Sequence, residues 1–190
     1  MSTVVIVMSM SLDGFVAGPD DDIGPVLDVW LDPPSGAMSD VNQKIVEGWF
    51  TTTAVVMGRR MFDLGARQSG WVENPPYAAP IFVVSHSVPD EIAAGGTNYT
   101  FVTDGVASAV KQAQEAAGDG FVTIAGGANV FQQALDAGLV DELRLHIAPV
   151  VLGRGIRLFD NLSTLPVELE VAEVVDTPDV THVTYRVVNG

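Results

Sequence analysis

The sequence predicts a single α/β domain with a mostly parallel central sheet, helices on its flanks and an antiparallel hairpin at the end. Apolar, β-branched runs alternate with helical patterns over most of the chain, which is typical of parallel sheets. The last two runs, 167–175 and 180–188, are separated only by a polar turn at 176–179, which predicts the hairpin. A length of 190 residues with 47% hydrophobic content suits one domain (1–190) with a substantial core.

Local patterns predict each element. The chain opens on a β-branched run at 3–9 that is typical of a central strand. Ser39 is a suitable N-cap, with Asp40 in the first turn, for a helix through Trp49. The other predicted elements are strands at 53–57, 81–84, 98–102, 121–125 and 142–151, and helices at 58–65, 106–117 and 129–137.

The stretch 19–36 is polar and interrupted by proline, and it predicts a long loop. Such loops in compact domains are often functional lids. The acidic run 20–22 within it could bind a cation, but a solvated acidic turn is the favoured interpretation. We therefore expect no metal site.

Charge and cysteine content exclude several classes of function. The net charge is −15, with 9 basic against 24 acidic residues, which argues against a surface for nucleic acid. Absence of cysteine excludes disulfides, thiolate zinc sites and cysteine nucleophiles, and fits a cytoplasmic protein. The first residues lack a basic region and run into a strand, which predicts no signal peptide. No apolar run is long enough to span a membrane.

Glycines mark two helix starts that follow strands, at Gly58 and at Gly126-Gly127. Backbone N–H groups at a helix start are unpaired and suit a phosphate. A tight connection that only needs glycine dihedrals is the alternative. In an open α/β sheet, ligands bind beyond the carboxyl ends of the strands, where both turns fall. A phosphate-rich ligand is the simpler explanation, and Arg59-Arg60 would be a local anion site in an acidic chain.

The order of the motifs resembles the dihydrofolate reductase superfamily, and most closely the reductase domain of the riboflavin-biosynthesis deaminase-reductase. The resemblance covers nearly the whole chain. Four segments carry it: the loop at 11–17, the Gly-Arg motif at 56–62, the Gly-Gly turn at 124–130 and the segment 138–159. The last segment is the most specific.

The resemblance implies an NADPH-dependent reductase that transfers hydride to a small planar heterocycle, pyrimidine- or pterin-like, as 5-amino-6-(5-phosphoribosylamino)uracil reductase does. It also implies a homodimer, formed through the terminal strands, and a cis Gly126–Gly127 peptide. A chain without a deaminase half is expected to serve another substrate than the riboflavin precursor. The implied cofactor-binding residues are Val16, Ala17, Gly58, Arg59, Arg60, Met61, Ser85, His86, Ala125, Gly126, Gly127, Ala128 and Asn129.

Three departures from the superfamily bear on the chemistry. Met61 stands where the family has a threonine that holds the pyrophosphate. Asn42 falls at the position of the acidic residue of dihydrofolate reductases, with Asp40 two residues before it, and Leu145 replaces that residue's threonine partner. Asp40 and Asn42 remain the candidate catalytic positions, but loss of the acid relay argues against dihydrofolate as substrate. A non-catalytic nucleotide- or ligand-binding protein on the same fold is the alternative.

Four further residues are candidates for substrate binding, two of them with a structural alternative. They are Asp13, which would otherwise bond its own turn, Trp30 and Phe159, which could line a planar pocket, and Arg157, which could be a surface arginine. Among the histidines, His146 is expected to be a satisfied core residue and His182 to lie on the surface.

Overall fold

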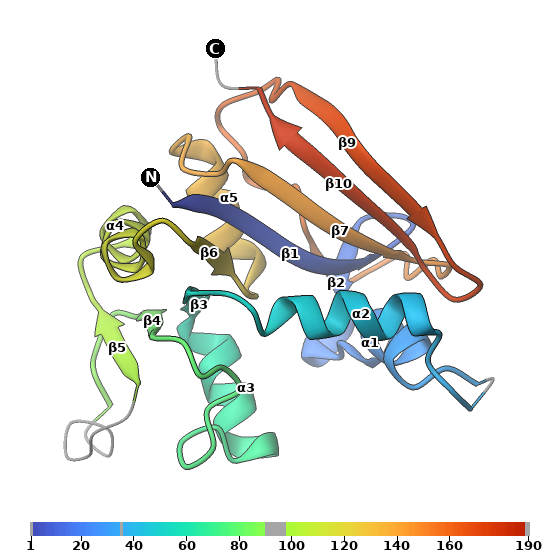
Figure 1. The fold of residues 1–190 in the computed structure, drawn as a ribbon, viewed down its shortest axis with the longest axis horizontal. Helices are drawn as coiled ribbons and strands as arrows, with labels where there is room; N and C mark the ends of the chain where they lie inside the picture. Colours follow the sequence, from blue (N-terminus) through green and yellow to red (C-terminus); the bar gives the residue numbers. More distant parts are fainter. Residues whose placement is uncertain (1, 35, 90–97, 189–190) are drawn as a thin grey trace.

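The computed structural model describes residues 2–34, 36–89 and 98–188, and its centre is an eight-stranded sheet of order β5-β4-β3-β6-β1-β7-β10-β9 (Figure 1). Pairs from β5 to β7 are parallel, whereas β7, β10 and β9 are antiparallel, as predicted. The strands are β1 (Thr3–Ser11), β3 (Ala54–Gly58), β4 (Ile81–Val84), β5 (Tyr99–Val102), β6 (Phe121–Ile124), β7 (Glu142–Ala148), β9 (Leu169–Asp176) and β10 (Thr181–Val187).

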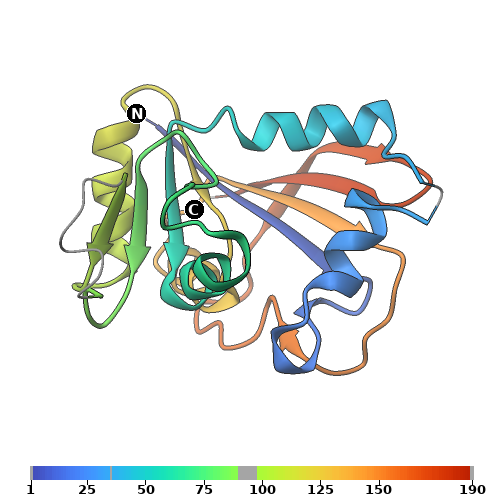
Figure 2. The same cartoon turned by 90° about the horizontal axis from the view of Figure 1, so that it is seen from below.

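Helices cover both faces of the sheet, which explains why the inner strands are apolar throughout. In β3, Ala54 and Val56 face a core shared with α4 (Val106–Ala117) and α5 (Ala128–Asp136). Val55 and Met57 face the opposite core, which includes Phe62 of α3 (Arg59–Ser69). Figure 2 shows α3 and α4 on different sides of the strands.

Two further helices, α1 (Gly24–Leu31) and α2 (Asp40–Trp49), lie together beside β1 and β7 (Figure 1). Trp30 and Trp49 join them, with ring centroids 5.4 Å apart in an edge-to-face contact. The predicted cap is present, because the Ser39 side chain accepts a hydrogen bond from the Asn42 N–H at 3.1 Å.

The prediction of a loop at 19–36 is wrong for residues 24–31, which form α1; residue 35 lies outside the described residues. This helix is only eight residues long, starts at Gly24-Pro25 and has no side-chain cap, so its local signal is weak. It forms because it buries Val26 and Trp30, four residues apart on one face.

Several boundaries also differ from prediction. A small second sheet, β2 (Phe15–Ala17) with β8 (Ile156–Arg157), was not expected. Helix α3 continues past Gly65 to Ser69, and β7 ends at Ala148. The cis prediction for the Gly126–Gly127 peptide is wrong, since the bond is trans. Positive φ values of 98° and 88° at the two glycines reverse the chain there without a cis bond.

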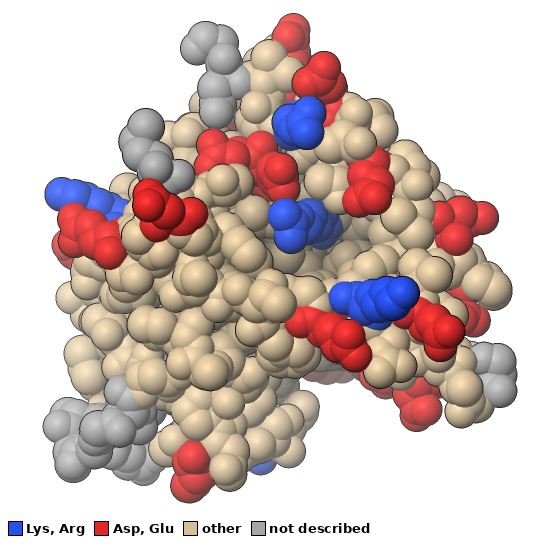
Figure 3. Space-filling model, viewed as in Figure 1, with Lys and Arg blue, Asp and Glu red and all other residues tan. Residues whose placement is uncertain are grey.

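The surface is acidic. Figure 3 shows separate groups of carboxylate side chains scattered over one face, with fewer basic side chains among them. Within the described ranges, no helix has both the length and the apolar character needed to cross a membrane.

Candidate functional site

A cavity of ≈ 240 Å³ lies toward the carboxyl ends of β1, β6 and β7. Its walls come from segments far apart in the sequence. They include Val7 and Ser9 of β1, Val16 and Ala17 of β2, Ile23 and Leu27 around α1, Trp49, Met61 of α3, Ala125 to Ala128, His146 and Ile156. The position agrees with the rule for open α/β sheets that predicted it.

The starts of α3 and α5 meet at the outer end of this cavity. A Cβ atom built on Gly127 would lie 3.8 Å from the Gly58 Cα, and one built on Gly58 would lie 3.1 Å from Val130 Cγ2. Neither helix start has a side-chain cap, in contrast to α2. Glycine at both positions therefore brings two sets of unpaired, partly positive N–H groups close together.

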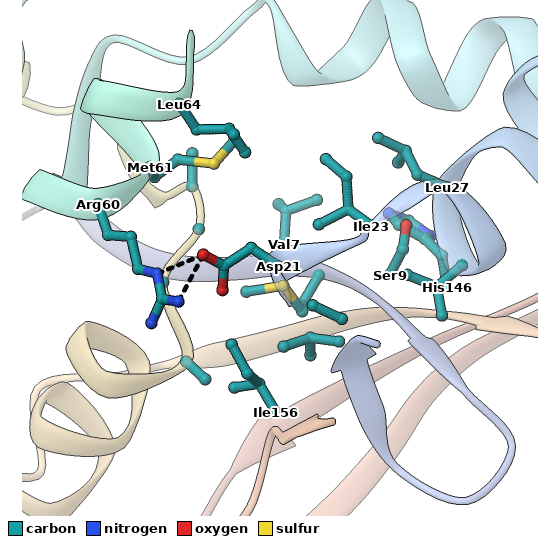
Figure 4. Close-up of a pocket in the computed structure, with 18 of the residues that line it drawn as sticks. Val7, Ser9, Asp21, Ile23, Leu27, Arg60, Met61, Leu64, His146 and Ile156 are labelled. Carbon is teal, nitrogen blue, oxygen red and sulfur yellow. Dashed lines mark hydrogen bonds and ion pairs between the residues drawn. The ribbon is translucent and has the colours of Figure 1, made fainter. Parts of the chain in front are cut away.

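The two predicted arginines flank these helix starts. Arg60 donates from Nε to Asp21 Oδ2 at 2.7 Å, and so joins α3 to the short 3₁₀ turn η1 (Pro19–Asp21) after β2 (Figure 4). Arg59 donates from Nε to Asp63 at 2.7 Å. Its Nη1 lies 3.4 Å from Ser85 Oγ. The structure thus brings Arg59 and Ser85 together at the carboxyl ends of the paired strands β3 and β4, the edge of the sheet where both were expected.

Most of the other predicted cofactor residues line the cavity. Gly58, Arg59 and Ser85 are not part of its wall, and neither are His86 and Asn129, whose side chains are exposed. Asn129 Oδ1 accepts from Gln133 Nε2 at 2.6 Å, within its own helix. The lining residues from the predicted set are Val16, Ala17, Arg60, Met61, Ala125, Gly126, Gly127 and Ala128.

The inner end of the cavity is different in character. In Figure 4, Ser9 and His146 lie together at the end opposite the Arg60–Asp21 pair. Behind His146, its Nδ1 lies 2.7 Å from Nδ1 of His182, and His182 Nε2 lies 3.0 Å from Asn42 Oδ1. A buried chain of three polar side chains from β7, β10 and α2 thus ends at the cavity wall.

Burial keeps these imidazoles neutral. Desolvation lowers the pKa of His146 to about 3, and repulsion from Arg144 and from a protonated His182 acts in the same direction. Desolvation also lowers the pKa of His182. Trp30 packs on both rings, with centroids 5.1 Å from His146 and 5.3 Å from His182.

The expectation for His182 is wrong, and the expectation for His146 is right about its burial but wrong about its hydrogen bonding. His182 is buried, because β10 lies between β7 and β9 and α2 packs against it through Asn42. His146 is buried too, at 3% exposure, but its Nε2 has no protein partner. The sequence pattern could have indicated which way His146 faces, since Leu143 and Leu145 alternate with Arg144 and His146 along β7. Leu145 enters the core with α4 and α5, so His146 faces the cavity instead.

The two candidate catalytic positions lie outside the cavity wall. Asn42 is fully buried behind it, in the chain with His182. Asp40 is exposed in the first turn of α2. Trp30, a candidate for substrate contact, is also fully buried and supports the histidines from behind.

The other three substrate candidates belong to a separate region. Asp13 accepts hydrogen bonds from the N–H groups of Leu152 at 3.0 Å and Gly153 at 2.7 Å. The Ser11 hydroxyl and these N–H groups lower its pKa to about 2. Arg157 lies over the Phe15 ring, 4.4 Å from its centroid. Phe159 packs on Phe131 and lines a second, apolar hollow with Leu162 and Leu165. None of the three lines the cavity.

Comparison with known proteins places the chain in a family. The family model described as the RibD C-terminal domain matches residues 2–183. The chain belongs to this family.

Within the described residues, no group of three or more His, Cys, Asp or Glu side chains could hold a metal ion.

The chain is similar to YyaP of Bacillus subtilis (strain 168), with 27% identity over 161 residues, 82% of this chain and 79% of the relative. A Shewanella sp. PV-4 structure named "Putative riboflavin biosynthesis protein" aligns with a TM-score of 0.77 and 22% identity, covering 98% of this chain and 99% of the other. A deaminase/5-amino-6-(5-phosphoribosylamino)uracil reductase of Thermotoga maritima aligns at 0.67 and 15% identity, over 98% of this chain and 57% of the larger protein. These structures share the predicted fold.

Proposed function

We propose that the protein is an NADPH-dependent reductase that transfers hydride to a small, planar heterocycle held at the inner end of the cavity. One observation carries the proposal. Two uncapped, glycine-led helix starts and an arginine–serine pair converge on the mouth of a cavity whose interior is apolar. This combination fits an anionic dinucleotide outside and a flat ring inside.

The residues at the mouth fit the charged half of the cofactor. N–H groups at the starts of α3 and α5 would bind the pyrophosphate, close to Gly58 and Gly127. Arg59 and Ser85 would bind the 2′-phosphate, for which a guanidinium supplies several fixed donors. Arg60 would exchange its exposed contact with Asp21 for a phosphate oxygen.

The interior fits the reacting half. When bound, the reduced nicotinamide would supply the hydride, and the protein would orient the rings and exclude water. Val16, Ala17 and Ile23 provide apolar walls for this purpose. The heteroatom of the reduced C=N or C=O bond would take its proton from a water molecule at the open mouth of the cavity, because Asp13 and Asp40 lie outside the wall and Asp21 is paired with Arg60.

A ligand-binding protein without turnover is the second candidate. The observation that favours it is the small number of side chains in the cavity wall that could donate a proton to a substrate. In the described residues that line the cavity, Asp21 supplies the sole carboxylate, and Arg60 pairs with it. The superfamily's acid position holds Asn42, which cannot titrate.

Cofactor binding is the decisive test. Affinity for NADPH and NADH is measured by calorimetry in the wild type, Arg59→Ala, Arg60→Ala and, as a matched charge control, Arg154→Ala in an exposed loop. We expect NADPH to bind at least about tenfold more tightly than NADH, the scale of one charge-assisted contact. Arg59→Ala should remove most of this preference and Arg154→Ala none. Equal, weak binding of both nucleotides would sink the cofactor assignment.

Turnover separates the two candidates. NADPH oxidation is followed with a panel of aminopyrimidines, pterins and pyrimidinones at concentrations that saturate the cavity by calorimetry. Oxidation that depends on one ring class supports the reductase. Tight binding of nucleotide and ring with no oxidation by any of them supports the binding protein.

We also propose that the chain forms a homodimer through β9. This strand lies at the edge of the sheet, so its outer backbone groups are free to pair. It exposes Leu169, Val171 and Val174, with Val171 at 60%. Sedimentation should show a dimer that Val171→Lys dissociates. The control Val151→Lys, at a similarly exposed valine outside β9, should leave the dimer intact.

A further inference from the structure

Buried polar atoms without a protein partner are concentrated at the inner end of the cavity. In the part of the chain that the structure describes, six buried side-chain nitrogen or oxygen atoms lack such a partner. Five of them belong to one cluster: Ser9 Oγ, Trp30 Nε1, Asn42 Nδ2, Trp49 Nε1 and His146 Nε2. Native proteins satisfy most buried polar groups, so the members of this cluster that line the cavity are candidates for hydrogen bonds to a ligand.

Three members of this cluster line the cavity itself, namely Ser9, Trp49 and His146. Ser9 and His146 are register partners on the adjacent parallel strands β1 and β7. Ring packing with Trp49, at 5.3 Å between centroids, and with Trp30 fixes the imidazole of His146. His146 Nε2 is therefore a fixed polar atom in an otherwise apolar wall.

The hydrogen-bond chain behind His146 determines the role of that atom. Asn42 Oδ1 is an acceptor, so His182 must carry its proton on Nε2. The Nδ1 of a neutral His182 is then an acceptor, so His146 must donate from Nδ1. This leaves the lone pair of His146 on Nε2, directed away from the chain. Asn42 thus sets the tautomer of two histidines without touching the cavity.

We propose that His146 is the substrate-contacting residue of the inner site, that its Nε2 accepts a hydrogen bond from a ring N–H, and that Asn42 and His182 are positioning residues that keep it an acceptor. The ligand class is an uncharged, planar heterocycle with an N–H donor, such as a cyclic lactam. Its identification as substrate rests on the proposed function. An ionic ring is disfavoured because the inner wall offers no carboxylate and the low pKa of His146 keeps it neutral.

Nitrogen NMR of the full chain tests the tautomers directly. With ¹⁵N-labelled histidine, we expect the protons on His146 Nδ1 and His182 Nε2. The probe is 2-pyridone, a neutral ring with one N–H, and N-methyl-2-pyridone is its matched control without that donor. Only 2-pyridone should shift the His146 Nε2 resonance. A proton already on His146 Nε2, or no response to either probe, would overturn the proposal.

Affinities supply the second readout. The wild type should bind 2-pyridone about five- to tenfold more tightly than N-methyl-2-pyridone, the range of one net hydrogen bond. We call this quotient of the two affinities the probe ratio, or the ratio for short. His146→Phe keeps an aromatic ring between Trp30 and Trp49, and should bring the ratio near one, which also excludes simple steric rejection of the methyl group. A ratio that survives His146→Phe contradicts the proposal. The wild-type NMR result stands even if this variant does not fold.

Substitutions at Asn42 distinguish positioning from simple support. Asn42→Asp retains the acceptor for His182 and should retain the ratio, whereas Asn42→Leu should reduce it. A purely structural Asn42 would lower both affinities together and leave their ratio unchanged. NADPH affinity is measured in parallel. If the ratio holds but NADPH does not bind, the proposed function fails alone; if NADPH binds and the ratio is one, this inference fails alone.

Discussion

The two ends of the cavity are built from different physics. The outer end uses backbone N–H groups at the starts of α3 and α5 and permanent charge on Arg59 and Arg60. The inner end uses neutral imidazole, indole and amide groups that are buried and incompletely paired. The outer end therefore suits a mobile, charged ligand that is exchanged, and the inner end suits a neutral ring that is recognised.

The energetic consequences differ as well. The Arg60–Asp21 pair is exposed, with 73% and 28% of the two side chains accessible, and such pairs contribute at most about 1 kcal/mol. It can open for a ligand at little cost. Each unpaired buried polar group at the inner end destabilises the folded state by about 1–3 kcal/mol. A ligand that offers a donor to His146 Nε2 and an acceptor to Trp49 Nε1 would therefore stabilise the folded protein.

The largest effect is expected at the outer end, from Gly126→Ala. A Cβ atom there would lie 3.1 Å from Met61 Cγ, at a φ of 98°. We expect NADPH affinity to fall by about a hundredfold, because the chain between β6 and α5 must shift at the phosphate site. Gly138→Ala is the matched control, with φ of 66° and open space around it. Both variants should lose about 1–2 kcal/mol of stability. Equal NADPH affinity in the two variants would contradict the proposed phosphate site at the start of α5.

The pH dependence of stability is a signature of the inner end. Unfolded histidine binds a proton near pH 6.5, whereas folded His146 does so only near 3. The contribution of His146 to stability is therefore complete above about pH 6.5, and it is lost as the pH falls from about 6.5 toward about 3. Urea unfolding should show a loss of about 2 kcal/mol from His146 between about pH 7.5 and about pH 5. His182, whose pKa is also lowered, adds to the loss in the same direction.

The control for this measurement is His146→Phe. At about pH 5, this variant should release about one proton fewer on folding than the wild type. Its free energy of unfolding should therefore depend less steeply on pH. Asp13 does not interfere, because its lowered pKa of about 2 moves its contribution below the ordinary carboxyl value of 3.8. A wild-type curve that is flat from neutral to about pH 5 would mean that the imidazoles are solvated in solution.

The contrast also explains what the sequence could predict. The outer end is encoded locally: a strand, one or two glycines and a helix are adjacent in the chain, as at 54–62 and 121–131. The alternation of strands and helices then indicates that the sheet is largely parallel. These features predicted the fold class and the position of the cavity, whereas eight of its lining residues were implied by the resemblance to the reductase domain.

The inner end is assembled from β1, α2, β7 and β10, whose members are up to 140 residues apart, as for Asn42 and His182. No local pattern links them, and helix α1, which supplies Trp30, has too weak a signal. The comparison with the superfamily drew attention to Leu145, which replaces the threonine partner of the acidic residue. His146 is the next residue along the strand. Alternation along β7 decides which of the two side chains faces the cavity, and only the packing of α4 and α5 fixes that choice.

A smaller effect is expected from Asp21→Asn at the outer end. Removing the carboxylate that occupies Arg60 should tighten NADPH binding by about three- to tenfold. Asp20→Asn makes the same change of charge one residue away, where the carboxylate makes no ion pair in the described structure, and asparagine tolerates the positive φ of both positions. The difference between the variants should shrink as salt is added. Identical affinities at low salt would show that Asp21 does not compete for Arg60.

The smallest effect compares two serines of β1. Ser11 is fully buried and satisfied, since its hydroxyl donates to Asp13 at 2.7 Å and accepts from the Phe15 N–H at 3.0 Å. Ser11→Ala leaves these partners unpaired and should cost about 1–2 kcal/mol in urea unfolding. Ser9 has a buried hydroxyl with no protein partner, so Ser9→Ala should change stability by less than about 0.5 kcal/mol, or raise it. A cost for Ser9→Ala as large as for Ser11→Ala would show that the Ser9 hydroxyl is satisfied without a ligand, and the inner end would lose its distinction from an ordinary core.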